Sequence, residues 1–557
     1  MTDAFNQQPR PHQSSQADLQ QRAATVPTAR KRANLVYCAV LVGVAFAVSY
    51  NGDIDGPLDL YHEGDRVAHY DTVKAGGLPF RDYFVQHGLG EDVLKPLTAF
   101  KLWGESIASL RRLGQNTFVY RGYLPALGAA GVVFAGCVLL GGGWPAAVPF
   151  ALVVAGLYEV SERPMLGFMA VAALGAYLGS GRRFWLFLAG CATGLAALYS
   201  LEVGLSTGAA ATLWLLTDRY VGSGRWKPRI IALAIFLAGL GVILAPMLIW
   251  CQGKGIIPDL LGNLSLQLFR RGELWDAEYP LPAWRASESF IDNLHVSIGV
   301  ISLFYLIPLT YGLGIVLGLV ARGRTSSKIK SATLLCALFG ACLWASVIGR
   351  PDLWHLAYAI GPFFLLVPRL VGMVRERGAD LKRSRVLVYF LLALPCVFVF
   401  EFGEGGSLGR RFAGHESMIL PSHLRKDDRE LVESTLPRLN GLRIPADQAA
   451  TLEALVHYIQ AHSSAEDPIL DLSDQGMIYF LSERRCPSRF HFLSHCSSPS
   501  LKQEMLDEVR AADRLPRLVI LPGPNPPQED VIGDFLRANY VRAIQIGPYQ
   551  VLRLAVP

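Results

Sequence analysis

The sequence predicts an α-helical membrane protein with about eleven transmembrane helices, followed by a C-terminal α/β domain outside the membrane. Two observations support this fold class. Of the 557 residues, 51% are hydrophobic and only 18% are charged, whereas a soluble protein has about 25% charged residues. Apolar runs approaching the roughly 20 residues that cross a bilayer recur between residues 34 and 403. This composition excludes a soluble enzyme, a disordered protein and a small disulfide scaffold.

The chain divides into three parts. Residues 1–33, rich in Gln, Ser and Pro, predict a disordered cytoplasmic tail. Residues 34–403 form the predicted transmembrane domain, which includes two large external loops at 51–115 and 251–294. Residues 404–557 form the predicted extracytoplasmic α/β domain.

Apolar runs and basic loops together predict the topology. The predicted spans are 35–50, 118–140, 146–159, 165–178, 184–199, 203–216, 230–250, 295–320, 331–348, 357–373 and 386–400. The basic clusters at 182–183, 219–229, 322–330 and 375–385 all fall in predicted cytoplasmic loops, as the positive-inside rule requires. The N-terminus is therefore expected in the cytoplasm and the C-terminus outside it, in a multi-pass protein of a bacterial inner membrane. A cleaved signal sequence ending near Ala45-Phe46-Ala47 is the alternative for the first span, and it leaves residue 51 outside as well.

The C-terminal part shows the patterns of a small α/β domain. Apolar residues at Ala449, Leu452, Val456 and Ile459 have the spacing of a one-sided helix over 447–462. The runs 469–472, 518–521 and 541–554 predict strands, with helices between them.

The nine cysteines are too few for a disulfide framework, and no CxxC pair or zinc-type Cys/His cluster is present. Cys486 and Cys496 lie in the predicted external domain, where an oxidising compartment would permit a disulfide between them. Two free thiols are the alternative.

The first external loop is long and unusually acidic for a simple connection. Its charged side chains include Asp59, His62, Glu63, Asp65, Asp82 and His87. Helices expected over 65–75 and 93–102 carry apolar residues on one side, which predicts that they lie on the membrane surface.

Two stretches of this loop carry a resemblance to a known family. They are His62-Glu63-Gly64-Asp65 and the sequence Gly-Gly-Leu-Pro-Phe-Arg-Asp-Tyr-Phe that starts at Gly76. Placed after a first span, they resemble the GT-C superfamily of membrane glycosyltransferases and are similar to protein mannosyltransferases and to bacterial lipid-A and arabinose transferases. The resemblance implies transfer of a sugar from a polyprenyl-phosphate carrier to a lipid, glycan or protein acceptor at the external membrane face. The family usually has Asp-Glu, or a lone Asp, just after the first span, whereas this chain has His62-Glu63.

The implied chemistry needs a carboxylate. In an inverting transfer, an acceptor hydroxyl attacks the anomeric carbon and a carboxylate removes its proton, an effect of about 10²–10⁴ in rate. Glu63 is the first candidate for this base, followed by Asp65 and Asp59. Asp82 is a candidate second acid that orients substrate or helps to hold a divalent cation such as Mg²⁺ or Mn²⁺. The plain alternative is a hydrated loop whose acids have no catalytic role.

The leaving phosphate needs cations at the membrane surface, and Arg suits this role because its planar fork pairs with two phosphate oxygens. Arg350 lies in a short external turn between two spans, together with Asp352 and His355, and Arg270 lies in the second external loop. An interfacial anchor paired with Asp352 is the alternative for Arg350.

Three further residues are candidates for substrate binding. His62 and His87 belong to the first external loop, and Glu202 lies at the tip of a predicted hairpin, where it can line a cavity beneath that loop. A carboxylate at the edge of the membrane must find a partner, a cavity or the interface.

Two other function classes remain open from the sequence. A secondary transporter or flippase for a lipid-linked or polar solute would concentrate ionisable residues at mid-membrane, and a scaffold would use the external domain to recruit a partner. No GxxxxGK[ST] phosphate loop is present. The net charge of +6 does not point to nucleic acid, because the basic residues lie in the predicted cytoplasmic loops.

Overall fold

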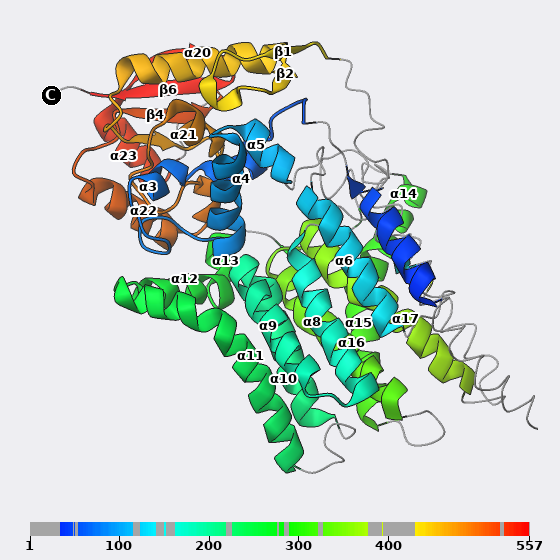
Figure 1. The fold of residues 1–557 in the computed structure, drawn as a ribbon. Coiled ribbons are helices and arrows are strands. Elements are labelled where there is room, and N and C mark those ends of the chain that lie inside the picture. Colours follow the sequence, from blue (N-terminus) through cyan, green and yellow to red (C-terminus); the bar gives the residue numbers. More distant parts are fainter. Residues whose placement is uncertain are drawn as a thin grey trace, which may run out of the picture.

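The computed structural model describes most of the chain. The described residues are 34–47, 49–50, 54–114, 123–140, 150–151, 162–218, 226–275, 278–282, 284, 289–320, 327–351, 353–376, 393, 429–523 and 529–555. They form two layers (Figure 1). One layer is a bundle of long helices, and the other combines the short helices of the first external loop with the C-terminal domain.

The bundle contains the apolar helices that the sequence predicts. Its described members are the first helix Asn34–Ala47, α6 (Tyr123–Leu139), α8 (Glu162–Ser180), α9 (Phe184–Tyr199), α10 (Leu201–Thr217), α11 (Trp226–Gly253), α14 (Phe290–Val300), α15 (Ile307–Val320), α16 (Ser327–Gly349) and α17 (Leu353–Glu376). A π-helical turn, Ile301–Leu306, joins α14 to α15. By length and composition, three described stretches can cross a membrane: Trp226–Gly253, Phe290–Val320 and Lys328–Gly349. The predicted spans 146–159 and 386–400 lie almost entirely outside the described residues.

The outer surface of the bundle is apolar as well as its core. Trp214, Phe339 and Tyr311 are buried in the core, whereas α11 exposes Ile249 and Val242. A soluble helix would keep its outer face polar, so an apolar outer face is the pattern of a helix that contacts lipid. The helices also approach closely through small residues, as membrane helices do. A Cβ on Gly190 of α9 would collide with the backbone of α11.

The first external loop folds into short helices: α2 (His62–Val67), α3 (Tyr70–Lys74), a π-helix (Gly90–Leu94), α4 (Lys95–Trp103) and α5 (Ile107–Leu113). The expectation that its helices lie on the membrane surface is corrected in part. Tyr70 and Phe100 pack into one hydrophobic core with Phe480 of the C-terminal domain. Much of the apolar side of the loop is therefore covered by protein, although α4 keeps Leu102 and Trp103 exposed.

The second external loop contributes two helices at the boundary between the layers. They are α12 (Ile257–Leu268) and the short α13 (Arg271–Leu274). α13 lies directly beneath the C-terminal domain (Figure 1).

The C-terminal domain has the predicted α/β character. Its four-stranded sheet has the order β3-β4-β6-β5, with β3 parallel to β4 and the other neighbours antiparallel. The strands are β3 (Ile469–Asp471), β4 (Leu518–Pro522), β5 (Tyr540–Ile546) and β6 (Tyr549–Leu554); β1 (Leu431–Glu433) and β2 (Arg443–Pro445) form a separate antiparallel pair. The helices are α20 (Ala446–His462), α21 (Met477–Ser482), α22 (Pro499–Ala511) and α23 (Val531–Asn539). The run 541–554 is a hairpin rather than one strand, because the chain reverses at Gly547, whose φ is +52°.

Cys486 and Cys496 are free thiols in this structure. Cys486 Sγ instead receives a hydrogen bond from the Tyr479 hydroxyl at 3.4 Å, and Cys496 is buried in the core of the domain. Of the two alternatives left by the sequence, the structure contains the free thiols.

Candidate active site

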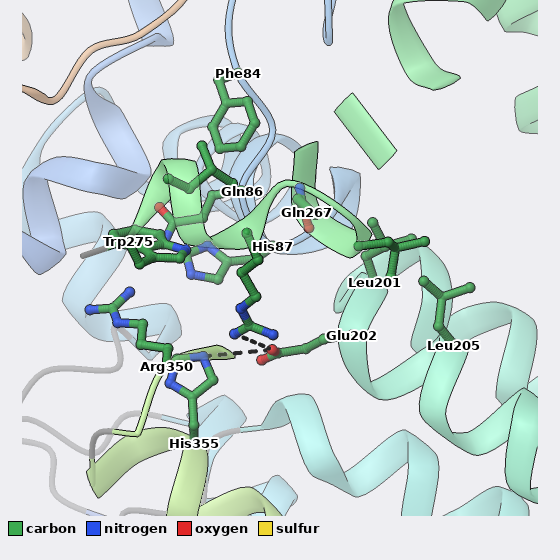
Figure 2. Close-up of a pocket in the computed structure, with 13 residues that line it drawn as sticks. Phe84, Gln86, His87, Leu201, Glu202, Leu205, Gln267, Trp275, Arg350 and His355 are labelled. Atoms are coloured by element: carbon green, nitrogen blue, oxygen red, sulfur yellow. Dashed lines mark ion pairs between the residues drawn. The ribbon is translucent and has the colours of Figure 1, made fainter. Parts of the chain in front are cut away.

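A small cavity of about 60 Å³ lies where the two layers meet (Figure 2). Its wall comes from the first external loop, the start of α10, the end of α12, α13 and the turn between α16 and α17. The lining residues are Phe84, Gln86, His87, Leu201, Glu202, Leu205, Gln267, Leu268, Arg271, Leu274, Trp275, Arg350 and His355. The cavity therefore brings together segments that are far apart in the sequence.

An arginine and a histidine lie beside one carboxylate in this cavity (Figure 2). Glu202 Oε2 lies 3.6 Å from Arg271 Nη2 and 3.6 Å from His355 Nε2. The Arg350 guanidinium lies 4.2 Å from the centre of the Trp275 ring, in a cation–π contact. Two arginines in one confined cavity form a site suited to a phosphate or another oxyanion.

The loop that carries His87 is held tightly against the α9–α10 junction. Leu201 N donates to His87 O at 2.6 Å, at the point where α10 begins. Gly88 has a φ of +158° and leaves no room for a side chain, since a Cβ there would lie 2.7 Å from Leu198 O. The junction thus places His87 and Glu202 in the same cavity wall.

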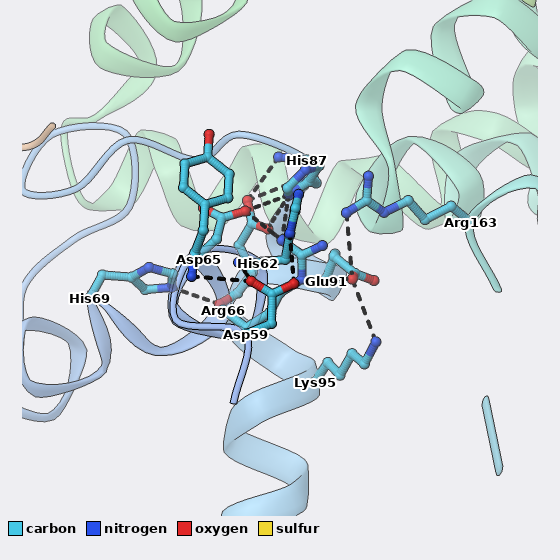
Figure 3. Close-up of polar contacts among 12 residues, drawn as sticks. Asp59, His62, Asp65, Arg66, His69, His87, Glu91, Lys95 and Arg163 are labelled. Atoms are coloured by element: carbon cyan, nitrogen blue, oxygen red, sulfur yellow. Dashed lines mark hydrogen bonds and ion pairs between the residues drawn. The ribbon is translucent and has the colours of Figure 1, made fainter. Parts of the chain in front are cut away.

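Behind the cavity lies a buried network centred on Arg66 (Figure 3). Arg66 Nη1 donates to Asp65 Oδ2 at 2.6 Å and lies 3.0 Å from His87 Nδ1. Asp92 contacts the same ring nitrogen, with Oδ1 2.8 Å from Nδ1, and its Oδ2 accepts a hydrogen bond from the His87 backbone amide at 2.8 Å. His69 lies 2.6 Å from the Asp92 carbonyl oxygen through its Nε2. The position of the His87 ring is therefore fixed by this network.

Three positively charged side chains of the network lie around one carboxylate oxygen of Glu91. Glu91 Oε1 accepts from Arg66 Nε at 2.9 Å and also lies within ion-pair distance of Lys95 and Arg163. These three cations hold the pKa of Glu91 well below its usual value, against the opposing effect of burial. Among the described residues, Glu91 Oε2 and Arg163 Nε are buried without a hydrogen-bond partner.

Two side chains next to the cavity have shifted pKa values. Burial raises the pKa of Asp65, and nearby Asp92 adds to this effect, although Arg66 opposes it. Burial lowers the pKa of His87 well below its usual value, helped by the positive charges of Arg163 and Arg66. His87 is therefore neutral near neutral pH and carries a single ring proton.

The geometry separates the three candidate bases. Glu63 is fully buried and both of its carboxylate oxygens accept from Arg111, at 2.6 and 2.9 Å. Asp59 accepts the Tyr61 and His62 amides and lies 2.8 Å from His62 Nδ1, so it shapes the start of α2. Burial raises the pKa of Asp59, but these contacts outweigh it and hold the pKa below its usual value. None of the three is among the residues that line the cavity, but Asp65 contacts its wall: in the favoured orientation of Gln86, a lining residue, the side-chain amide donates to Asp65 Oδ1 at 3.1 Å.

Other predicted site residues lie away from the cavity or outside the described chain. Asp82 lines a second, polar cavity between the first external loop and the C-terminal domain, and it pairs with Arg81 at 3.0 Å. Arg270 is paired with Glu273 at 2.7 Å and is not among the residues that line the cavity of Figure 2. Asp352 lies outside the described residues. No group of three or more His, Cys, Asp or Glu within the described part of the chain can hold a metal ion.

The structure places Arg350, His355, Glu202 and His87 in the lining of one cavity. Sequence reasoning chose Arg270 over its neighbour Arg271 and missed Trp275 and Gln86; Arg271, Trp275 and Gln86 line the same cavity. Arg271 is adjacent to the predicted Arg270, and only the direction of the side chain distinguishes them. Gln86 and Trp275 carry no charge and follow no motif, so no sequence signal could have identified them.

The described structure is that of a largely helical protein whose longest apolar helices can cross a membrane, with an oxyanion-type cavity at one end of the bundle. No family model matches the chain, and no curated protein matches it. Among solved structures, it is similar to ArnT from Cupriavidus metallidurans bound to undecaprenyl phosphate, with 13% identity over 94% of this chain and 99% of that chain and a TM-score of 0.47. It is also similar to the apo state of the same protein, with 13% identity over 94% of this chain and 100% of that chain and a TM-score of 0.40.

Proposed function

We propose that this chain is a membrane glycosyltransferase that moves a sugar from a polyprenyl-phosphate carrier to an acceptor at the extracytoplasmic face. The proposal rests on one observation: Arg271 and Arg350 both line a cavity between the apolar bundle and the polar layer. A carrier lipid has an apolar tail and an anionic head, so its binding site needs cations where an apolar bundle ends. The sequence resemblance to GT-C transferases supplies the reaction class.

In the proposed reaction the acceptor hydroxyl attacks the anomeric carbon of the sugar. The new bond joins the acceptor oxygen to that carbon, and the bond from the carbon to the phosphate oxygen breaks. Arg271 and Arg350 stabilise the negative charge that grows on the leaving phosphate, and such preorganised charge is a large source of catalysis. Polyprenyl phosphate leaves and the configuration at the anomeric carbon inverts.

We assign the general base to Asp65. Its side chain keeps 14% exposure, whereas Glu63 is sealed against Arg111. Arg66 and Gln86 orient the Asp65 carboxylate, and its raised pKa makes it a better proton acceptor than an ordinary aspartate. Asp65 takes the proton of the acceptor hydroxyl during the attack.

Glu202 and the histidines have supporting roles in this proposal. Glu202 holds Arg271 and His355 at 3.6 Å from its carboxylate, which keeps both side chains in the cavity before the carrier binds. His87, neutral and fixed by Asp92, presents its other ring nitrogen for a hydrogen bond to substrate.

The test is sugar transfer from a panel of radiolabelled polyprenyl-phosphate sugars, with purified protein in nanodiscs and a membrane extract as the acceptor. We expect transfer from at least one donor, its loss in Asp65→Asn, and retention of carrier binding in that variant. Loss of transfer in Glu202→Gln with normal transfer in Asp65→Asn would instead assign the base to Glu202.

A transporter or flippase is the alternative that the same material can test. Reconstituted vesicles loaded with labelled carrier would show movement of the label across the bilayer without any change in its covalent structure. Such movement, together with no transfer from any donor, would contradict the proposed function.

A further inference from the structure

The C-terminal domain forms hydrogen bonds to α13, the short helix that contributes part of the cavity wall. Ser498 N donates to Glu273 O at 3.1 Å, and Ser500 Oγ donates to Glu273 Oε2 at 2.8 Å. Ser497 Oγ donates to Leu274 O at 3.1 Å. These bonds hold α13, which carries Arg271 into the cavity, and fix the start of the segment that carries Trp275.

His495 contacts two residues of the cavity lining, Trp275 and Gln86. Its ring meets Trp275 edge-on, with 4.6 Å between the ring centres, and Trp275 in turn stacks with Arg350. His495 Nε2 also accepts the Gln86 amide at 3.2 Å, and the same amide group lies 3.1 Å from Asp65. One buried side chain of the C-terminal domain therefore contacts both the aromatic support of the arginine and the amide beside the proposed base.

The charge state of His495 fits both contacts. Burial, together with the positive charge of Arg350, lowers the pKa of His495 to about 3. The ring is therefore neutral at physiological pH and Nε2 can accept a hydrogen bond. A cationic ring would lose this acceptor and would repel Arg350.

We propose that His495 is a positioning residue, through which the C-terminal domain sets Trp275 and Arg350 by one contact and Gln86 and Asp65 by the other. The domain then supports the cavity wall from behind, through contacts with Trp275 and Gln86. This inference rests on the proposed function for its catalytic meaning, but its structural content can be tested separately.

Two variants of the full-length protein separate the two contacts. His495→Phe keeps an aromatic ring against Trp275 and removes the acceptor for Gln86, whereas His495→Ala removes both. His491→Phe is the matched control, because His491 is another buried histidine of the same domain, and its ring contacts His69 and Tyr479. All three proteins are prepared in nanodiscs and compared with the wild type.

The first measurement is hydrogen exchange of the segments 271–275 and 349–355, which requires no substrate. We expect faster exchange in His495→Ala and wild-type exchange in His491→Phe. Unchanged exchange in His495→Ala would overturn the proposal. This result stands even if the wild type fails to bind polyprenyl phosphate, a failure that would instead contradict the proposed function.

The second measurement is the affinity for undecaprenyl phosphate and the rate of transfer. We expect His495→Ala to weaken carrier binding about five- to tenfold, as loss of a well-placed cation–π support would. His495→Phe should keep the affinity within about twofold and lower kcat, because only the Gln86–Asp65 side is disturbed. Equal losses of affinity in the Ala and Phe variants would overturn the role of the ring.

A double-mutant cycle with Arg350→Ala completes the test. If His495 acts through Arg350, the His495→Ala change should have little further effect on affinity in the Arg350→Ala background. Fully additive losses would show that His495 acts by another route, and the proposal would fail.

Discussion

Arg111 forms a buried ion pair with the carboxylate of Glu63 through two hydrogen bonds. Nε donates to Oε1 at 2.6 Å, Nη2 donates to Oε2 at 2.9 Å, and both side chains are fully buried. Arg111 also donates to the carbonyl oxygens of Ile54 and Pro57, at 2.7 Å each. The pair therefore ties the entry of the first external loop to α5, and the glutamate of the His62-Glu63-Gly64-Asp65 motif has a structural role.

We expect Glu63→Gln to destabilise the protein by about 3 kcal/mol or more, because it leaves the Arg111 charge buried without its counter-ion. Apparent thermal unfolding in nanodiscs measures the effect. The matched control is Glu105→Gln, which removes an exposed partner of Lys74 and should cost no more than about 1 kcal/mol. If Glu63→Gln melts at the wild-type temperature but no longer transfers sugar, the structural role is contradicted and Glu63 becomes the general base.

Arg350→Ala and Arg271→Ala should each weaken binding of undecaprenyl phosphate by roughly ten- to a hundredfold, since a hydrogen bond to a charged group contributes about 1.5–3 kcal/mol. Arg270→Ala is the control one residue away, because Arg270 is exposed and paired with Glu273. Titration of the purified variants with the carrier lipid measures the three affinities. Equal losses in Arg270→Ala and Arg271→Ala would contradict the assignment of the cavity.

Asp65→Asn should lower kcat by about 10²–10⁴ and leave carrier affinity nearly unchanged, as expected for loss of a general base. The base must be ionised to accept a proton, so wild-type activity should fall as the pH is lowered through the pKa of Asp65. Because burial raises that pKa, the fall should begin at a higher pH than for an ordinary aspartate. A pH profile of kcat that stays flat down to the ordinary aspartate range would oppose this role.

Gly64→Ala should loosen the contact between α2 and the C-terminal domain. A Cβ at Gly64 would collide with the Met477 amide nitrogen and approach the Gly476 carbonyl carbon to 3.1 Å. Forcing backbone apart in a packed contact costs about 1–3 kcal/mol, so we expect a lower melting temperature and faster proteolysis.

Gly262→Ala on α12 is the matched control for this change, because a Cβ there meets nothing within 4 Å. It should leave stability unchanged or raise it by up to about 1 kcal/mol through helix propensity. A Gly64→Ala protein as stable as this control would show that the close contact is not required.

The helices and strands could be predicted where the pattern of apolar residues along the chain is local. The helix α9 was predicted with both of its ends, and the strand patterns at 469–472 and 518–521 mark β3 and β4. Apolar runs and alternation depend only on neighbouring residues, so the chain itself carries the signal. The hairpin β5–β6 was predicted as one run, because its reversal at Gly547 interrupts the apolar pattern for only two residues.

The candidate site was only partly predictable. Arg350, His355 and Glu202 could be proposed because a charge at the edge of an apolar run needs a special environment. The choice between Arg270 and Arg271, and between Glu63 and Asp65, depends on partners contributed by distant segments. Arg111, 48 residues after Glu63, decides that Glu63 is sealed.

The sequence by itself determined that this is a chain of apolar helices with a long acidic loop after the first helix and an α/β domain near its end, because hydropathy and periodicity are properties of consecutive residues. Only the tertiary structure decided which carboxylate is sealed by a buried arginine and which arginines line the cavity. It also decided that the first external loop and the C-terminal domain share one core around Tyr70, Phe100 and Phe480. The physical reason is that burial and pairing of a charge depend on what packs against it, and here the packing partner is often hundreds of residues away.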